Sequence, residues 1–463
     1  MSTDAPLLLS PNYYVGIGAS AGGLEAIEQF FQGISPHTGL AYIVIQHLSP
    51  DYKSLMVELL SKKATIPVLR AEEGMVVERD TIYLIPPKKN LTIFHGKLLL
   101  SDQPLHDRWI NLPIDIFLRS LAEDQQERAI GVILSGTGSD GSRGIRAIKE
   151  HGGMVMVQDE HDARFDGMPK NAVSTGMADF ILKAEEMAGK LLAFIKYPYL
   201  TKVEEGERLV KADDSLSSIF SMLRSKIKVD FTFYKPSTVV RRIERRMNIN
   251  QVDGLPAYVH MLKGNSRELM TLYRELLIGV TNFFRDREAF DYLAESLLPE
   301  LVRQKKQAPL RVWVAGCSTG EEAYSLAIVL QDLIAKGLLH NQVKIFATDV
   351  DNDAIMTAGA GIYPESIAAD VGPALLSQYF HHKGDHYHVS RNIREMVVFA
   401  QHNLINDPPF THIDLVSCRN LLIYLQPTLQ KKVMEMFNFS LNPGGLLFLG
   451  SSETTGEMSG YFT

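Results

Sequence analysis

Cysteine is scarce in this chain, whose 463 residues include only Cys317 and Cys418. So few cysteines exclude a disulfide framework, and neither has a metal-ligating neighbour at useful spacing. Long hydrophobic runs are missing too. Stretches such as Leu40–Ile45 and Leu446–Leu449 fall far short of the roughly 20 residues that a membrane helix needs, and no signal-type segment follows Met1. We therefore expect a cytoplasmic protein without membrane insertion.

The sequence also lacks an excess of basic residues. Its 47 Lys and Arg against 54 Asp and Glu give a formal net charge of −7, whereas sequence-independent nucleic-acid binding needs a basic surface that releases counterions. We expect no nucleic-acid partner. The composition, 45% hydrophobic and 22% charged, is that of a folded globular protein. The length favours two or three domains, each with its own core.

The N-terminal part alternates short β-type runs with amphipathic helical segments, which is typical of an α/β domain with a largely parallel, doubly wound sheet. The expected strands are Tyr13–Gly18, Ala41–Gln46, Thr81–Ile85, Ala129–Leu134 and Met154–Gln158. The charged stretch Lys202–Lys211 indicates a linker. We assign residues 1–195 to this domain and residues 196–214 to the linker.

The second half opens with repeated helical spacing and few strand signals, which predicts a small helical domain over residues 215–295. A second α/β run then fills residues 296–463, with helices expected at Glu321–Ile334 and Pro427–Phe437. Its expected strands are Leu310–Ala315, Val343–Thr348, Met396–Ala400, Leu415–Ser417 and Gly445–Leu449.

Ser20 lies on a glycine-rich turn between the first expected strand and a helix, and its spacing fits the G-x-S-x-G nucleophile elbow. A serine needs a histidine base and an orienting carboxylate. His47 ends the second strand and Asp140 follows the strand Val132–Leu134, so all three fall at one edge of a parallel sheet. Taken alone, Ser20 also fits a tight glycine-rich turn, His47 a histidine at the edge of the core, and Asp140 an ordinary turn aspartate. Together they predict a hydrolase site, in an order unlike that of α/β-hydrolases.

Five segments extend this pattern: Gly16–Gly23, Ile45–His47, Tyr83–Pro87, Val132–Gly141 and Gly167–Pro169. They resemble the catalytic domain of CheB, the chemotaxis receptor methylesterase, over about residues 12–193. The resemblance implies hydrolysis of glutamyl methyl esters, and often deamidation of glutamine, with Ser20 as nucleophile, His47 as base and Asp140 as orienting acid. Ala21 stands where these enzymes usually carry Thr, and Thr137 stands where they usually carry Met. Because backbone N–H groups form the oxyanion hole, these departures affect the expected rate more than the mechanism. Without a receiver domain, we expect no control by aspartyl phosphorylation in this segment.

A second glycine-rich loop, Gly316–Gly320, follows the strand Leu310–Ala315 and opens a helix. Glycines there let the backbone approach a ligand closely, and Asp349, at the end of the next strand, suits ribose hydroxyls. The loop departs from G-x-G-x-x-G, and the acid comes later than the usual spacing of about 20 residues. Alone, the pattern fits an ordinary α/β turn as well as a nucleoside site.

Longer motifs surround this loop: Thr281–Asp286, Val314–Glu322, Ala347–Asp349, His402–Leu404 and Cys418–Tyr424. From about residue 216 onward the chain resembles CheR, the chemotaxis receptor glutamate methyltransferase. The resemblance implies an S-adenosylmethionine cofactor, S-adenosylhomocysteine as product, a Rossmann-like fold and a small β-subdomain. It implies that Arg285 pairs with the cofactor carboxylate near Thr281, and that Tyr424 borders the methyl group. The other implied pocket residues are Glu322, Asp349, Asn403, Leu404, Asn420 and Leu421. A substrate glutamate, with an ordinary pKa of about 4.3, is already anionic at neutral pH and needs no general base.

Four arginines at i, i+1, i+4 and i+5 share one side of a predicted helix: Arg241, Arg242, Arg245 and Arg246. Taken alone, such a face is more simply a solvated one, paired with acids such as Glu244. With the CheR resemblance, we expect it to bind an acidic substrate helix.

The segment His381–His388 holds four histidines, but its one carboxylate and the lack of a nearby cysteine leave no clear ligand set, so we expect no metal site. In CheR-like enzymes this region forms a small β-subdomain that can dock a receptor tail, and Tyr379–Val398 fits its length. Relatives continue through another strand beyond Ser451–Glu457, so we expect this sequence to be part of a longer protein.

The sequence therefore predicts a bifunctional modifier of the cytoplasmic helices of methyl-accepting receptors, in which one half adds and the other removes a glutamyl methyl ester. Sensory or kinase regions beyond residue 463 are further expected partners. Both activities together would form a futile cycle, so we expect control by domain arrangement, substrate access or such regions. The alternative is a signalling scaffold whose pockets bind a ligand or partner without turnover.

Overall fold

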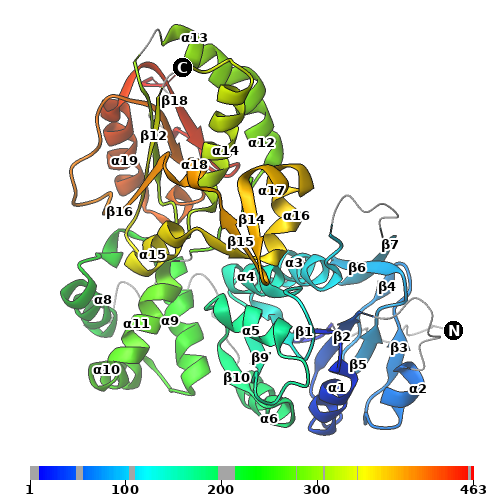
Figure 1. Cartoon of the computed structure of the whole chain (residues 1–463). Coiled ribbons are helices and arrows are strands. Elements are labelled where there is room, and N and C mark those ends of the chain that lie inside the picture. Colours follow the sequence, from blue (N-terminus) through cyan, green and yellow to red (C-terminus); the bar gives the residue numbers. More distant parts are fainter. Residues whose placement is uncertain are drawn as a thin grey trace, which may run out of the picture. The chain divides into compact units, whose positions relative to one another are not determined.

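The computed structural model describes residues 10–47, 56–103, 110–196, 214–277, 279–305, 308–340, 342–456 and 460–462. The chain folds into two compact units, one formed mainly by residues up to Leu200 and the other mainly by residues from Thr201 onward (Figure 1). The predicted linker segment Lys202–Lys211 lies outside the described residues. Within the described ranges, no helix has the length and apolar character needed to cross a bilayer.

The first unit is built on a seven-stranded sheet in the order β10-β9-β8-β1-β2-β5-β3, and every strand pair is parallel. Its strands are β1 (Tyr13–Ala19), β2 (Leu40–Gln46), β3 (Val68–Arg70), β5 (Thr81–Leu84), β8 (Ala129–Ile133), β9 (Met154–Gln158) and β10 (Phe180–Leu182). All seven residues of β1 are buried, as expected for a parallel strand covered on both faces. The five predicted strands are confirmed, each to within one residue.

Helices cover both faces of this sheet. α1 (Gly23–Gln32), α2 (Met56–Ser61) and α6 (Ala184–Ile195) share one core with the strands. α3 (Pro113–Gln125), α4 (Ser142–Glu150) and α5 (Gly167–Ser174) form the other core, together with a small antiparallel sheet that the sequence did not indicate. That sheet consists of β4 (Met75–Val76), β6 (Lys89–Phe94) and β7 (Lys97–Asp102).

The strand order reverses at β1, which has β2 on one side and β8 on the other. In open parallel sheets, ligands bind beyond the carboxyl ends of the strands at such a switch point. The loops after β1, β2 and β8 are therefore the expected location of a site.

The described part of the second unit begins with the α-helices α8 (Asp214–Ile227), α9 (Pro236–Asn250), α10 (Leu255–Gly264) and α11 (Ser266–Leu277). A five-stranded parallel sheet follows, in the order β16-β12-β11-β17-β18. Its strands are β11 (Leu310–Ala315), β12 (Val343–Asp349), β16 (Val397–Gln401), β17 (Ile413–Cys418) and β18 (Leu441–Leu449). Leu272 of α11 and Trp313 of β11 belong to one core, so the helical segment packs directly on the α/β part.

Other helices of this unit cover or flank its sheet: α12 (Arg287–Tyr292), the π-helix Leu293–Leu297, α13 (Leu298–Gln304), α14 (Glu321–Ala335), α15 (Asn352–Ala360) and α19 (Pro427–Ser440). The expected small β-subdomain is present as the sheet β13-β15-β14. It consists of β13 (Ile362–Pro364), β14 (Phe380–Lys383) and β15 (His386–Val389), accompanied by the short helices α16 (Ala368–Val371), α17 (Pro373–Tyr379) and α18 (Arg391–Arg394).

Candidate active sites

Ser20, His47 and Asp140 follow the three central strands of the first unit. Backbone bonds tie these strand ends together: His47 N–H donates to Ala19 O (3.1 Å), and Ser20 N–H donates to Ser135 O (3.0 Å). The sequence predicts that these three residues meet at one edge of the sheet, and in the structure they follow the ends of neighbouring strands.

The acid and the base are in direct contact. His47 Nε2 lies 2.8 Å from Asp140 Oδ2, and the Asp140 side chain is 2% exposed. Asp140 also accepts hydrogen bonds from the N–H groups of Ile114 (3.0 Å) and Asp115 (2.9 Å) in the first turn of α3, where the helix dipole favours a negative charge. An Nε2–H bound to Asp140 leaves Nδ1 of His47 as the nitrogen that can accept a proton. Among the described residues no hydrogen bond joins Ser20 to His47.

Gly136 brings the loop after β8 against the serine. Its N–H donates to Phe165 O (3.0 Å), and its carbonyl accepts from Met168 N–H (2.8 Å). A Cβ atom at this position would lie 2.2 Å from Met168 Sδ and 2.9 Å from Ser20 Cβ. Only glycine therefore allows this loop, the serine turn and α5 to approach so closely.

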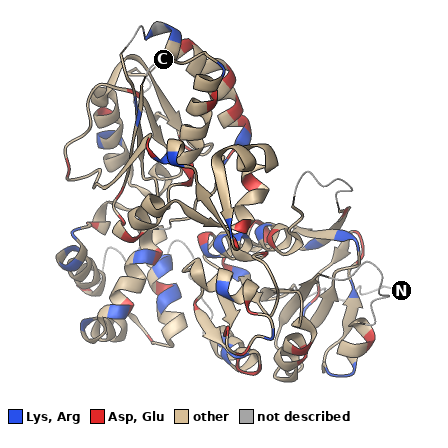
Figure 2. Cartoon of the chain, viewed as in Figure 1, with Lys and Arg blue, Asp and Glu red and all other residues tan. Residues whose placement is uncertain are grey.

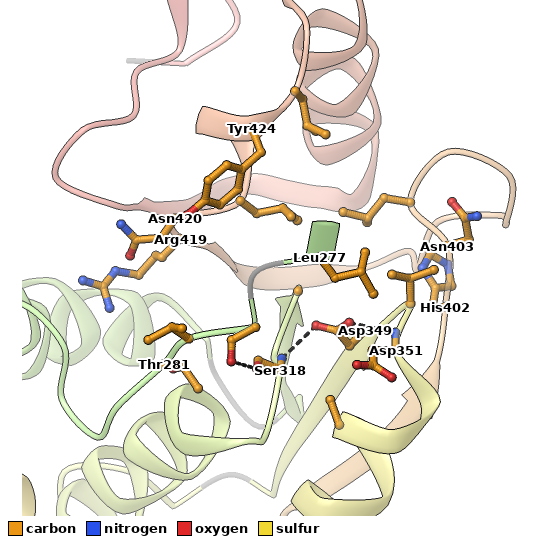
Figure 3. A pocket seen from close by; sticks show the side chains of 18 of the residues that line it. Leu277, Thr281, Ser318, Asp349, Asp351, His402, Asn403, Arg419, Asn420 and Tyr424 are labelled. Carbon is orange, nitrogen blue, oxygen red and sulfur yellow. Dashed lines mark hydrogen bonds between the residues drawn. The ribbon is translucent and has the colours of Figure 1, made fainter. Parts of the chain in front are cut away.

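A cavity in the second unit brings together all nine residues predicted for the cofactor and the methyl group. They are Thr281, Arg285, Glu322, Asp349, Asn403, Leu404, Asn420, Leu421 and Tyr424. In Figure 3, Asp349 and Asp351 lie on one side of this cavity and Tyr424, Asn420 and Arg419 on another. Ser318, Asp351, His402 and Arg419 also line the cavity, although the sequence analysis gave them no part in it.

The glycine-rich loop and Asp349 form one connected structure. Gly316 adopts a φ of 78°, and a Cβ atom there would lie 2.9 Å from Leu421 Cδ2. The Asp349 carboxylate accepts from Ser318 N–H (2.8 Å) and from Asp351 N–H (2.9 Å) (Figure 3). Burial raises the pKa of Asp349. Each carboxylate oxygen keeps a second lone pair for a hydroxyl donor.

Glu322 and Arg419 form a buried polar group at the edge of the cavity. Ser417 Oγ donates to Glu322 Oε1 (2.7 Å), and Arg419 Nη1 lies 3.8 Å from Glu322 Oε2. Burial raises the pKa of Glu322, and Arg419 opposes this shift. Arg419 Nη2 also donates to Arg285 O (2.8 Å) and to Asp286 Oδ2 (2.7 Å). Arg419 thereby fixes the backbone that carries Arg285.

Glu453 is a functional candidate that the sequence analysis missed, because it treated the surrounding segment only as a polar stretch. Its carboxylate accepts four backbone N–H groups, from Asn420 (2.8 Å), Leu421 (2.9 Å), Leu422 (2.7 Å) and Gly450 (2.8 Å). Two of these residues, Asn420 and Leu421, line the cavity. Glu453 therefore holds a wall of the pocket from a distant part of the chain.

The four predicted arginines all lie on α9, and at least two of them are bound to acids within the protein, while their expected binding of a substrate helix stays a prediction. Arg245 forms an ion pair with Glu275, and Arg246 binds Glu268 through Nε (2.8 Å) and Nη2 (2.6 Å). Both glutamates belong to α11 of the same helical bundle. The side chains of Arg242, Arg245 and Arg246 are buried. Figure 2 shows the basic residues of α9 along the helix, and part of this charge binds α9 to α11.

Three family models match the chain in succession. Residues 15–191 match the CheB methylesterase model. Residues 214–277 match the all-alpha domain of CheR methyltransferase, and residues 279–463 match its SAM-binding domain. The cofactor of the second unit is thus S-adenosylmethionine, in agreement with the cavity.

Individual relatives agree with these models. An uncharacterized 104.1 kDa protein of Rhodobacter capsulatus is 41% identical over 430 residues, which cover 88% of this chain and 45% of that protein. The chain thus spans less than half of that relative. The chemotaxis protein methyltransferase of Salmonella typhimurium is 33% identical over 258 residues, 53% of this chain and 86% of that one. The solved catalytic domain of Thermotoga maritima CheB methylesterase is 29% identical, with a TM-score of 0.36, and the match covers 40% of this chain and 99% of that domain. The chain belongs to the chemotaxis protein methyltransferase (CheR) family, and it carries a CheB methylesterase domain ahead of the methyltransferase.

Proposed function

We propose that this chain both adds and removes methyl esters on glutamate side chains of the cytoplasmic helices of methyl-accepting receptors. The observation that carries the proposal is that the residues predicted for each of two sites lie together on one chain. One is the 2.8 Å contact between His47 and Asp140 beside the turn of Ser20. The other is the cavity lined by all nine residues expected around the cofactor and methyl group.

In the esterase, Ser20 Oγ attacks the ester carbonyl while His47 Nδ1 takes its proton. The ring then gives this proton to the leaving methoxide, which departs as methanol, and the same base activates the water that releases the glutamate. Asp140 keeps Nε2–H oriented and stabilises the protonated ring. The N–H groups of Ala21 and Gly22, just before α1, suit the oxyanion. Because these donors are backbone groups, alanine in place of threonine at position 21 preserves them.

In the methyltransferase, S-adenosylmethionine supplies the electrophilic methyl group, and the protein residues bind and orient the reactants. The cavity combines an acid at the end of β12 with a cation at Arg285, which suits the ribose and the carboxylate of this cofactor. Asp349 accepts the ribose hydroxyls and Arg285 binds the cofactor carboxylate. The substrate carboxylate enters beside Tyr424 as an anion and needs only positioning and partial desolvation.

The test is methyl transfer from labelled S-adenosylmethionine to a glutamate-rich receptor fragment, followed by collection of volatile methanol. We expect base-labile label on the fragment and its later release as methanol. Cofactor binding without transfer or release, on several receptor fragments, would contradict the proposal and support the signalling scaffold.

The contact of Gly136 with the serine turn predicts a large effect of Gly136→Ala on the esterase. The added methyl group would displace Ser20 or Met168, and a displacement of about 1 Å at reacting groups costs roughly 100-fold in rate. Methanol release from a methylated fragment should fall by about that factor, with methyl transfer unchanged. Gly189→Ala on α6 is the matched control, because a Cβ atom there meets nothing within 4 Å. Equal loss in both variants would refute the assignment of Gly136.

The four bonds to Glu453 predict weak cofactor binding in Glu453→Gln. The amide nitrogen of glutamine cannot accept the N–H groups that one carboxylate oxygen now accepts, so the loop Asn420–Leu422 must shift. Because hydrogen bonds to a charged group are lost, we expect the affinity for S-adenosylmethionine, measured by calorimetry, to fall by roughly 10-fold or more. Glu435→Gln, an exposed change on α19, should bind as wild type does. Unchanged affinity in Glu453→Gln would show that the loop holds without this carboxylate.

A further inference from the structure

A second carboxyl group lies directly beside the triad acid, and the mechanism above gives it no part. Asp115 is 1% exposed and lies in the first turn of α3. Its Oδ1 accepts the N–H groups of Arg143 (2.9 Å) and Gly144 (2.7 Å), in the first turn of α4. Its Oδ2 is buried, and the described residues offer it no hydrogen-bond partner.

We propose that Asp115 is a positioning residue of the esterase, which joins the N-termini of α3 and α4 around Asp140 and so holds Asp140 in place behind His47. This inference rests on the proposed esterase activity. It concerns a residue that binds no substrate and acts only through the triad.

The hydrogen bonds of the two aspartates are reciprocal. Asp140, which precedes α4, binds two N–H groups at the start of α3, including that of Asp115. Asp115, within α3, binds two N–H groups at the start of α4. The two helices are in close contact here, since a Cβ atom on Gly144 would lie 2.5 Å from Leu118 Cβ. Loss of the Asp115 carboxyl would therefore free the start of α4 and, with it, the loop that holds Asp140.

The protonation of Asp115 agrees with this role. Burial, and then the neighbouring Asp140, raise the pKa of Asp115 to about 7, while Arg143 acts in the opposite direction. Asp140 and Arg143 are the charged groups that face Asp115, and His47 lies on the other side of Asp140. Below its pKa Asp115 is mostly protonated, so it places no second negative charge beside Asp140, and its Oδ1 still accepts both N–H groups of α4.

The test compares Asp115→Asn and Asp115→Ala with wild type in the full chain, as kcat and KM for methanol release at neutral pH. We expect kcat of Asp115→Asn at neutral pH to stay within about threefold of wild type, because the amide oxygen still accepts both N–H groups. Asp115→Ala should lose about 10-fold or more in kcat with KM unchanged, since a displaced base acts on the chemical step.

Asp124→Asn is the matched control. Asp124 lies on the same helix and accepts the N–H groups of His95 and Gly96, so it tests the same kind of bond away from the triad. Its kcat and KM should equal those of wild type. A kcat that is unchanged in Asp115→Ala, or one that falls as far in Asp115→Asn as in Asp115→Ala, would overturn the proposal.

A second readout needs no turnover. Because folding raises the pKa of Asp115 from 3.8 to about 7, the folded protein takes up a proton, and this stabilisation is lost as the pH rises between about 4 and 7. We identify the thermal transition of the esterase domain as the one whose midpoint S-adenosylhomocysteine does not change. Between about pH 5 and 8 this midpoint temperature should fall more in wild type than in Asp115→Asn. Equal falls in the two proteins would refute the titration of Asp115. An inactive wild type would refute the proposed function and, with it, the positioning role. An active wild type with an unchanged kcat in Asp115→Ala would refute only the inference on Asp115.

Discussion

Replacing Ser20 by alanine should abolish methanol release from a methylated receptor fragment while methyl transfer continues. Without the hydroxyl the triad has no nucleophile, and removal of the serine from a comparable triad costs about ten-thousand-fold or more. The cofactor cavity lies in the other compact unit, so its chemistry should be untouched. Trapped volatile methanol measures the loss, and base-labile label on the fragment measures the transfer.

The same variant should also accumulate more label than wild type. In the wild-type chain the esters formed at one site are hydrolysed at the other, so net methylation reflects both rates. Ser174→Ala on α5 is the control, because this exposed serine donates only to Asn171 O (2.7 Å). Release at the wild-type rate from Ser20→Ala would exclude the serine mechanism.

The strands that could be predicted from the sequence are those with long buried runs. β1 and β8 are completely buried, and their apolar residues are continuous enough to indicate a parallel strand. The strands β3, β4 and β10 have only three, two and three residues. Such segments are too short to show a period, and tertiary pairing alone decides their conformation. The antiparallel sheet of β4, β6 and β7 was missed in part for this reason.

The site residues that could be predicted differ from those that were missed in a similar physical way. Ser20, His47 and Asp140 were predicted because each follows a strand, and strand ends meet at one edge in a parallel sheet. Asp115 and Glu453 were missed because they act by accepting backbone N–H groups from segments distant in the sequence. No side-chain pattern reports such bonds.

The arginines of α9 show the opposite error. Their spacing on one side of the helix was read correctly, but the acids that bind Arg245 and Arg246 lie on another helix. Glu268 lies 22 residues after Arg246, and Glu275 lies 30 residues after Arg245. A charge pattern on one helix cannot show whether a neighbouring helix neutralises it. Because a buried ion pair that loses one partner is strongly destabilising, alanine at either arginine would test folding before it tested substrate binding.

Arg285→Ala should weaken binding of S-adenosylmethionine strongly and, at cofactor concentrations near the wild-type Kd, remove most methyl transfer. Arg285 lines the cavity, and its Nη1 donates to Val280 O (3.1 Å), which fixes the guanidinium there. A guanidinium can bind a carboxylate with two parallel hydrogen bonds, and truncating one member of such a charged pair costs about 2–5 kcal/mol. We expect affinity to fall by about 100-fold or more, measured by calorimetry. Arg285→Lys should recover only part of it, because lysine offers a point charge without the planar fork.

The value of this variant lies in what it leaves intact. A fragment methylated beforehand should still release methanol with Arg285→Ala, since Ser20, His47 and Asp140 belong to the other unit. Arg303→Ala, an exposed change on α13, should match wild type in both assays. Ser20→Ala and Arg285→Ala thus remove opposite halves of one cycle: one keeps the ester and the other forms little of it. Transfer at the wild-type rate in Arg285→Ala would mean that the cofactor carboxylate is bound elsewhere in the cavity, and Arg419, the other arginine that lines it, would then be the residue to replace.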